Sequence, residues 1–364
     1  MPFGIMDTTY VDLPAGIDEA YLRSLSNRSG TSFAEVLTRI DSRMVSFNDA
    51  LDPLMAELMY VTDDVLTEEF SPVAFDVNEA GEYTVARPQY TGGQKAYMLP
   101  IRKYDVSTMW TEDGLLTMSD RSIDTNLDSI LLGLRTRARK EFLRRLFSDA
   151  EVPIDTNSAV TNPGFAGSGT GNNAFTRPYP DGTASTGITH YIRDTTANRI
   201  AAIRSARTKL RKWYPEAIVD VLPTETFLNA FLADPLITGG VGTTWVTPGS
   251  SLVRPADTVA EALVDPDKYV GVLDGNIRVR KAITDFASDH ASVFLSFGNL
   301  SDQNALAWRF DPMFGRESYL RSRSMFPLDQ SIVLWKFGIG VSNRVAAVDI
   351  YIAASGAYVP PTIT

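Results

Sequence analysis

The segment Ser119–Asp149, SDRSIDTNLDSILLGLRTRARKEFLRRLFSD, predicts one long amphipathic helix. Its apolar residues recur at intervals of three and four, which places them on one stripe of a helix with 3.6 residues per turn. They are Ile123, Leu127, Ile130, Leu131, Leu134, Ala138, Phe142 and Leu146. Ser119 is a suitable N-cap, and about 30 helical residues extend about 45 Å. Since that exceeds the diameter of a small domain, we expect the helix to cross more than one structural unit.

The charges of this segment are separated along its length. Aspartates lie near its start and basic residues in its second half, so both signs complement the helix dipole. These residues are Asp120, Asp124 and Asp128, then Arg135, Arg137, Arg139, Lys140, Arg144 and Arg145. Arg137, Lys140 and Arg144 share a second stripe, away from the apolar one. This basic stripe is either a solvated face or a surface that meets acidic groups on another chain.

Length and composition indicate an ordinary folded chain. Its 364 residues can form two or three domains, and 44% hydrophobic with 21% charged residues excludes a disordered protein. The net charge of −10 argues against a protein whose main work is to grip phosphate backbones. Cys is absent, which excludes disulfides and thiolate sites. The N-terminus lacks the pattern of a signal peptide, and no apolar run is long enough to span a membrane.

The sequence before the long helix predicts an N-terminal arm and a β-hairpin. Ser32 and Glu35 form a capping box at the start of one helix, and a second short helix is expected at 51–59. From Glu68 to about Thr117, proline and glycine interrupt short alternating runs. Gly92-Gly93 is a two-residue hairpin signal, so we expect a long hairpin with its tip near residues 90–95. The hairpin is too polar to form a hydrophobic core of its own, and we therefore expect it to lie on a neighbouring subunit.

The sequence after the long helix predicts an α+β domain near residues 191–300. Residues 155–190 are rich in Gly, Asn, Thr and Ser, which is typical of a long loop. The elements expected next are a helix over 194–213, a buried strand over 217–222, a helix over 224–233, a loop over 235–255 and a helix over 256–263. Strands follow around an Asp274-Gly275 turn, at ASVFLSFG and through the C-terminal section.

Residues able to carry catalysis are few and scattered. His190 and His290 are the two histidines, and no HExxH, GxSxG or Cys/His cluster is present. The glycine-rich run 167–171 lacks the Lys-Ser/Thr ending and the following helix of a phosphate loop. Paired carboxylates, for example at 68–69 and 112–113, leave a glycosidase-like hydrolase open, but nothing places them at a cleft. We therefore expect no enzyme, no cofactor and no metal.

Three stretches, taken in chain order, have the order of elements and the residue composition of one known architecture. They are FSPVAFDVNEAGEYTVARPQYTGGQKAYMLPIRKYDV at 70–106, the helical segment at 120–149, and ESYLRSRSMFPLDQSIVLWKFGIGVSNRVAAVDI at 317–350. They resemble the E-loop, the spine helix and the closing strands of HK97-like tailed-phage major capsid proteins. In the closing part a basic strand, Tyr319–Arg323, precedes a second strand, Ser331–Phe337. The resemblance covers nearly the whole chain and implies an α+β fold of the HK97-like capsid class.

The resemblance also implies a division of the chain. Its parts are an N-terminal arm with helices at 1–63, the E-loop hairpin at 64–117, a P-domain with the spine helix at 118–190 and 301–340, and an A-domain at 191–300 and 341–364. It implies no catalytic, cofactor-binding or metal-binding residues. The candidates for contacts between subunits are Tyr90, Gly92, Gly93, Lys95, Arg137, Lys140, Arg144, Arg321 and Arg323.

The function that the resemblance implies is that of a structural shell subunit. Such a protein self-assembles as hexamers and pentamers into an icosahedral capsid around phage double-stranded DNA, located in the virion and, during assembly, in the host cytoplasm. The implied partners are a portal, a separate scaffold protein, DNA bound without sequence specificity and a decoration protein, with no membrane. About 60 residues precede the hairpin, which leaves no room for a fused scaffold segment.

Two further expectations concern cross-linking and alternatives. Some family members join a hairpin Lys to an Asn covalently, and Lys95 could supply the amine. Residues 305–342 contain no Asn, so we expect a non-covalent shell. The alternatives are an encapsulin-like cellular compartment shell and a β-rich hydrolase that uses paired carboxylates.

Overall fold

The computed structural model describes most of the chain beyond its N-terminal arm. The described residues are 26, 28–32, 35, 38–39, 42–43, 46, 53–69, 95–110, 117–155, 160–167, 189–195, 198–215, 218–238, 245–247, 268–284, 286, 288–312, 319–325, 328–353 and 357–362. The chain forms two compact units. The first unit comprises Met1–Met55, Ile101–Glu141 and Arg309–Gly338, and the second comprises Ala56–Pro100, Phe142–Trp308 and Ile339–Thr364.

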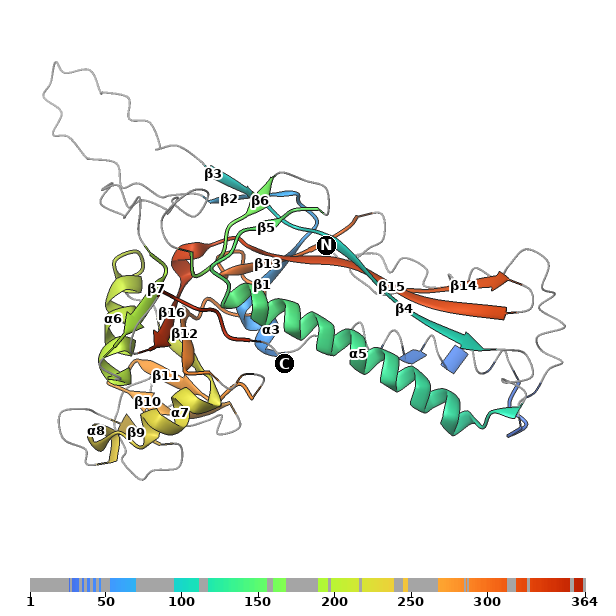
Figure 1. Ribbon diagram of the computed structural model, residues 1–364, viewed down its shortest axis with the longest axis horizontal. Coiled ribbons are helices and arrows are strands. Elements are labelled where there is room, and N and C mark those ends of the chain that lie inside the picture. The colour runs from blue at the N-terminus through green and yellow to red at the C-terminus, as the bar shows by residue number, and fades with distance from the viewer. Residues whose placement is uncertain are drawn as a thin grey trace, which may run out of the picture. The chain divides into compact units, whose positions relative to one another are not determined.

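The long helix is present as α5, Asp120–Leu146 (Figure 1). Ser119 caps it, because its hydroxyl oxygen accepts the Ser122 N–H at 3.3 Å. All eight residues of the expected apolar stripe are buried, and such burial is worth about 1.5–3 kcal/mol for each large side chain. The helix contributes residues to both units, with the division at Glu141 and Phe142. The expectation that it crosses structural units is confirmed.

Three antiparallel strands accompany α5 in the first unit (Figure 1). They are β4 (Arg102–Trp110), β14 (Tyr319–Met325) and β15 (Leu328–Val341). Strand β15 lies between the other two, with Leu334 opposite Asp105 on one side and Tyr319 on the other. The two expected closing strands are therefore confirmed as neighbours. The Tyr104 ring of β4 stacks on Phe337 of β15 at a centroid distance of 4.6 Å.

The expected hairpin is present at its base but differs in its pairing. Strand β2 (Leu66–Glu69) pairs antiparallel with β3 (Lys95–Met98), so that Glu69 lies opposite Lys95. A two-residue turn at Gly92-Gly93 would instead place Tyr90 opposite Lys95, so that register is wrong. A Gly-Gly pair permits a tight turn, but it does not choose the partner strand. The expected tip, apart from Lys95, lies outside the described residues.

The hairpin prediction was also too long on its C-terminal side. Strand β4 falls within the predicted range Glu68–Thr117, but it pairs with β15 over Arg102–Trp110. The partner is more than 200 residues away in sequence, with Trp110 opposite Asp329. Local alternation identifies a strand, but a partner at that distance leaves no local signal.

A seven-stranded mixed sheet forms the centre of the second unit (Figure 1). Its order is β7 (Tyr191–Asp194), β16 (Ala347–Ile352), β12 (His290–Leu295), β8 (Val219–Pro223), β11 (Ile277–Arg280), β10 (Tyr269–Leu273) and β9 (Trp245–Val246). The β7–β16 and β11–β8 pairs are parallel, and the others are antiparallel. Every residue of β8 is buried, as expected for a central strand.

Two helices pack on this sheet and form its hydrophobic core. They are α6 (Arg199–Arg211) and α7 (Glu225–Leu232). The expected line of apolar residues on α6 is buried, including Ile200, Ile203 and Leu210. The predicted start at Asp194 is wrong, because Asp194 ends β7 and Asn198 caps the helix by accepting the Ala201 N–H at 3.0 Å.

Several local predictions are confirmed by backbone geometry. Asp274 and Gly275 have φ of 51° and 78° in the loop between the paired residues Leu273 and Ile277, so both adopt the left-handed conformation that Asp and Gly tolerate in turns. Thr224 caps α7. Ser32 and Glu35 exchange both capping-box hydrogen bonds, at 3.0 and 3.3 Å, and the described residues from 35 to 46 are helical.

The remaining elements are short. They are α3 (Pro53–Leu58), β1 (Met59–Thr62), the pair β5 (Val152–Pro153) and β6 (Thr161–Asn162), α8 (Pro235–Thr238), β13 (Leu306–Phe310) and the 3-10 helix Arg344–Ala346. Helix α3 matches the short helix expected at 51–59. Elements β6, α8 and β9 fall within stretches that we predicted as loops. The helix expected at 256–263 lies outside the described residues.

Candidate functional site

In the first unit, the N-terminal segment binds the start of α5 through a ladder of ion pairs. Arg39 lies 3.4 Å from Asp120 and 3.7 Å from Asp124, and Arg43 lies 3.4 Å from Asp124 and pairs also with Asp128. Both series advance by four residues, so each lies on one helical face and the two segments run in the same direction. We call this contact the aspartate ladder.

The aspartate ladder fixes the arm to α5 at its first turn as well. Thr31 donates a hydrogen bond to Asp120 at 2.7 Å, and the Asp120 N–H donates to Ser29 at 3.3 Å. The acidic end of α5 is therefore occupied by a segment of the same chain. Its carboxylates do more than complement the helix dipole, which was their only role in the sequence interpretation.

The basic stripe on α5 has mixed surroundings. Arg137 is half exposed and pairs with Glu141 at 2.6 Å, and its guanidinium lies 5.3 Å from the centre of the Tyr104 ring. Lys140 is partly buried, and Arg144 is exposed. Glu141 balances one of these three charges, so the stripe keeps a positive surplus on the helix surface. Arg145, next to the stripe, is buried at 3% exposure and belongs to the interior.

The other contact candidates fall where side chains are not described. Lys95 lies in β3 opposite Glu69, and Arg321 and Arg323 lie in β14 opposite Ile332 and Gln330. Tyr90, Gly92 and Gly93 lie outside the described residues. Of the nine candidates, the basic stripe is thus the one group whose side-chain environment the structure describes.

Asn162 joins four separate stretches of the second unit at the base of the hairpin. Its amide nitrogen donates to the carbonyls of Met98 and Val341 at 3.0 and 3.2 Å, and its amide oxygen accepts from Val341 N–H at 2.9 Å. Arg145 also donates to that oxygen. Since Asn162 is fully buried, these bonds satisfy the amide. We call this contact the Asn162 junction.

Packing around the Asn162 junction leaves no room for a larger residue at Gly340. A Cβ atom there would lie 2.6 Å from both Leu99 and Pro100 and 3.3 Å from the Asn162 amide nitrogen. The side chains of Leu99 and Pro100, on the segment that leaves β3, therefore lie directly against the backbone of Gly340, and a Cβ atom there would have to displace them. The junction fixes where the hairpin leaves the body of the second unit.

A buried charge cluster lies on β8, β10 and β11. Asp220 is fully buried and accepts hydrogen bonds from Arg278 at 2.5 Å, from Arg280 at 2.8 and 3.0 Å and from Tyr269 at 3.2 Å. Burial, with the nearby Asp220 charge, raises the pKa of Tyr269 to about 12, so its hydroxyl stays protonated. The charges are mutually satisfied, which indicates a structural role.

The cluster extends to α3 through Glu57, which pairs with Arg280 and Lys268. Burial opposes ionisation of Glu57, but hydrogen bonds and charge from Lys268 and Arg280 outweigh it and hold its pKa below the ordinary value. Glu57 therefore remains a carboxylate. This network ties α3 to the seven-stranded sheet.

Neither histidine has the surroundings of a catalytic base. His190 is fully buried, and burial, followed by the charges of Arg344 and Lys209, holds its pKa well below the ordinary value. Burial also lowers the pKa of His290. His290 lies 2.8 Å from the Val359 carbonyl and 3.0 Å from the Ser288 hydroxyl. Both imidazoles are neutral, and His290 holds the C-terminal segment in place.

The described residues contain no group of three or more His, Asp or Glu side chains placed to hold a metal ion. Over the same part of the chain, no helix has the length and apolar character needed to cross a bilayer.

Comparison with known proteins gives matches in structure alone. No family model and no curated protein matches the chain in sequence. A structure from Mycobacterium phage Patience matches with a TM-score of 0.64 and 17% identity, over 96% of this chain and 97% of that chain. The asymmetric unit of the bacteriophage PhiM1 mature capsid matches with a TM-score of 0.50 and 9% identity, over 84% and 89%. The chain has a phage capsid fold. The HK97-like class expected from the sequence is confirmed.

Several features of this HK97-like chain escaped the sequence interpretation. Asn162 gave no signal, because a single Asn in a glycine-rich stretch looks like a turn residue. Arg39 and Arg43 could have been paired with the aspartates of α5, since both series repeat every four residues. Asp220 lies in a run that was correctly predicted as a buried strand, and a charge in such a run is a signal for a buried partner.

Proposed function

We propose that this chain is a major capsid protein that assembles as hexamers and pentamers into an icosahedral shell around double-stranded DNA. The single observation that supports this most is the match with the Patience structure over nearly the full length of both chains. A shell subunit needs no catalytic centre, which agrees with the neutral, buried histidines. Its location would be the virion, with assembly in the host cytoplasm.

The extended elements of the chain support a protein that functions in contact with its own copies. Val65 and Leu66, at the base of the hairpin, are 43% and 48% exposed, and Leu132 on α5 is 65% exposed. Two-stranded ribbons are marginally stable alone. We propose that the hairpin beyond β2 and β3 packs on an adjacent subunit, as an E-loop, and that the basic stripe, Arg321 and Arg323 also contact other copies.

The four-part division at 1–63, 64–117, 118–190 with 301–340, and 191–300 with 341–364 is part of this proposal, with the paired hairpin of the second part ending at β3. It assigns the arm, E-loop, P-domain and A-domain of the HK97-like class. A portal, a separate scaffold protein and a decoration protein are the partners that such a shell would use. Because the subunit carries a net charge of −10, like-charge repulsion would prevent the shell from binding the DNA tightly.

Electron microscopy of the purified protein tests the proposal directly. We expect closed icosahedral particles, and particles from infected or producing cells should contain nuclease-protected DNA. Boiling these particles in SDS should yield a single band at 40.0 kDa. A cargo protein in place of DNA would favour an encapsulin-like compartment. A small soluble species that never assembles, with or without a scaffold protein, would contradict the shell.

A hairpin deletion tests the proposed contact with the adjacent subunit. Removing residues 85–94 spares β2, β3 and the Asn162 junction, so the variant should keep the circular dichroism and melting of the wild type. It should fail to form closed shells, because the contact beyond β3 is lost. Normal shells from this variant would contradict the proposed role of the hairpin.

A further inference from the structure

Lys209 on α6 lies among other cations. Its side chain is partly buried, and among the residues that the structure describes its ammonium forms no hydrogen bond or ion pair. The charges that act on it come from Arg344 and Lys212, and both are positive. Arg344 is fully buried in the 3-10 helix Arg344–Ala346, whereas Lys212 is exposed. Burial and like charges both favour the neutral amine of a lysine over its ammonium.

These surroundings make Lys209 a nucleophile. Burial, followed by the charges of Arg344 and Lys212, lowers the pKa of Lys209 to about 8. At pH 7 its free-amine fraction is therefore about 300-fold higher than that of a lysine with the ordinary pKa of 10.5. Lysines that are desolvated, or that lie beside another cation, act as nucleophiles in enzymes. The chemistry expected of Lys209 is attack on an electrophilic carbon atom.

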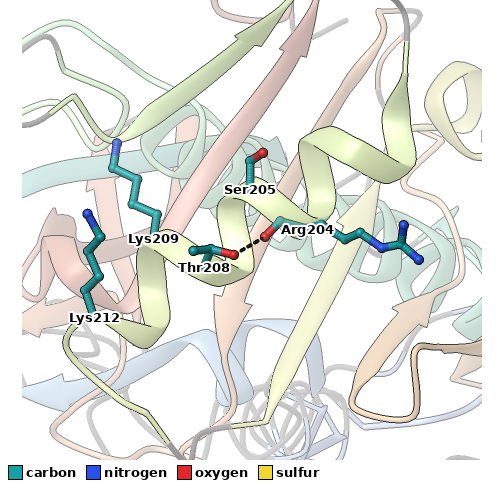
Figure 2. Close-up of a pocket in the computed structure, with 5 residues that line it drawn as sticks. All are labelled: Arg204, Ser205, Thr208, Lys209 and Lys212. Atoms are coloured by element: carbon teal, nitrogen blue, oxygen red, sulfur yellow. Dashed lines mark hydrogen bonds between the residues drawn. The ribbon is translucent and has the colours of Figure 1, made fainter.

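A small reactant can reach Lys209 from solvent. Lys209 lines a shallow hollow of about 330 Å³ on the outer side of α6, which we call the α6 hollow. The other lining residues are Arg204, Ser205, Thr208 and Lys212. Figure 2 shows the Lys209 and Lys212 side chains extending to the same side of the helix, while Arg204 extends to the other. The Lys212 charge therefore lies on the side of the hollow where Lys209 would react.

We propose that the Lys209 amine in the α6 hollow reacts reversibly with carbon dioxide to form a carbamate. The lone pair of Nζ forms a bond to the carbon atom, the electrons of one C=O π bond move onto oxygen, and a proton leaves the nitrogen for solvent. The step transfers no electrons between redox partners and needs no leaving group or co-reactant. The inference is independent of shell assembly, because every group that it uses belongs to one subunit.

The charges around Lys209 favour carbon dioxide over other carbon electrophiles. A carbamate is an anion, so the repulsion of Lys209 by Arg344 and Lys212 becomes an attraction when it forms. An aldehyde would give an imine, which is neutral or cationic and gains no such attraction. An acyl donor must expel a leaving group, and no carboxyl or imidazole group lines the hollow to assist that step.

The test locates the carbamate on the full-length protein. The protein is equilibrated with ¹³C-labelled bicarbonate and carbon dioxide at pH 8, an ethylating reagent converts carbamates into stable esters, and mass spectrometry of peptides identifies the labelled residue. We expect a labelled Lys209. Reading single peptides separates Lys209 from the N-terminal amine, whose pKa of about 7.7–8.0 also permits carbamate formation. The same measurement reports on Lys103, an exposed lysine of β4, which should carry at least tenfold less label.

A matched pair of variants tests the role of the neighbouring charge without changing Lys209. Lys212→Gln removes one of the two positive charges, so the label at Lys209 should fall at least twofold at the same pH and the same concentration of carbon dioxide. Lys103→Gln lowers the net charge equally and should leave the label at Lys209 unchanged. Equal label on Lys209 and Lys103, or equal loss at Lys209 in the two variants, would overturn the inference.

The pH dependence gives an independent readout. At a fixed concentration of dissolved carbon dioxide, the label at Lys209 should fall by more than about tenfold from pH 8 to pH 6, because the ammonium form cannot attack. His190, on which the Lys209 charge acts, has a pKa held well below the ordinary value and stays neutral over this range.

The melting temperature measures the effect of the carbamate on the subunit. Bicarbonate, compared with chloride at equal pH and ionic strength, should raise the melting temperature of the wild type, because the carbamate attracts Arg344 and Lys212. Lys209→Arg keeps the positive charge and cannot form the carbamate, so its melting temperature should not respond. An equal response in the two proteins would contradict the assignment to Lys209.

Discussion

Two aspartates of the second unit are fully buried in the same sheet, and their surroundings are opposite. Asp220 on β8 is held by Arg278 and Arg280. Asp349 on β16 is equally buried, and burial raises its pKa well above the ordinary value, so its surroundings favour the protonated form. The difference shows that the neighbours of a carboxyl group decide whether it is buried as an ion or as an acid.

A substitution at Asp220 should give the largest effect. Asp220→Asn keeps the shape but removes the buried carboxylate that Arg278 and Arg280 share, and breaking such a buried pair costs about 3–5 kcal/mol. Urea unfolding at neutral pH should show this loss. The matched control is Asp349→Asn, which removes a carboxyl group whose ionised form burial disfavours, so this change should not destabilise the protein. Equal losses in the two variants would mean that both aspartates are buried in the same state.

The pH dependence of stability should have opposite signs for Glu57, which belongs to the Asp220 cluster, and for Asp349. Glu57 has a lowered pKa, so the stability it contributes is present above its ordinary pKa of 4.5 and is lost as the pH falls through the lower folded value. Glu57→Gln should therefore be less stable at neutral pH and should lose less stability on acidification. Measurements of unfolding free energy between about pH 3 and pH 7 test this.

Asp349 should respond in the other direction. Its pKa is raised, so its contribution is fully present below its ordinary pKa of 3.8 and is lost as the pH rises toward the folded value. Asp349→Asn should remove that loss and stabilise the protein at neutral pH relative to acid pH. A wild-type profile that matches the Asn variant throughout would contradict the raised pKa.

The aspartate ladder of the first unit offers an exposed counterpart to the Asp220 cluster. Arg39 and Arg43 have side chains 43% and 36% exposed. Exposed pairs contribute about 0–1 kcal/mol each and weaken with salt. Asp124 takes part in two such pairs, so Asp124→Asn should cost less than about 2 kcal/mol at low salt and almost nothing at high salt. A loss comparable to that of Asp220→Asn would show that exposure does not govern the difference.

The smallest effect on folding is expected at the basic stripe. Arg137→Glu with Arg144→Glu removes the Arg137–Glu141 pair and places like charges four residues apart, which costs a few tenths of a kcal/mol. Melting should hardly change, whereas shell assembly at low salt should weaken if these cations contact acidic groups on other copies. Assembly equal to wild type would identify the stripe as a solvated face.

The sequence predicted elements better than it predicted their partners. The apolar stripe of α5, the β10–β11 turn and the consecutive strands β14 and β15 follow from local period and turn chemistry, which a single stretch contains. The partner of β4 and the register of Lys95 were wrong, because pairing across long sequence distances depends on the whole fold. Among candidate sites, the basic stripe was visible from helical spacing, whereas the α6 hollow required knowing which face of α6 is buried.

The Asn162 junction has a consequence for the order of folding. Its bonds join Asn162 to Met98 and Val341, separated by 64 and 179 residues. Contacts with such separations form late, after nearer elements have shortened the effective distance between them. The Val341 N–H, bonded to the Asn162 side chain, should therefore be among the last amide protons to gain protection from hydrogen exchange during refolding. Protection of this amide would show that the base of the hairpin, the C-terminal end of α5 and the end of β15 have come together in one subunit.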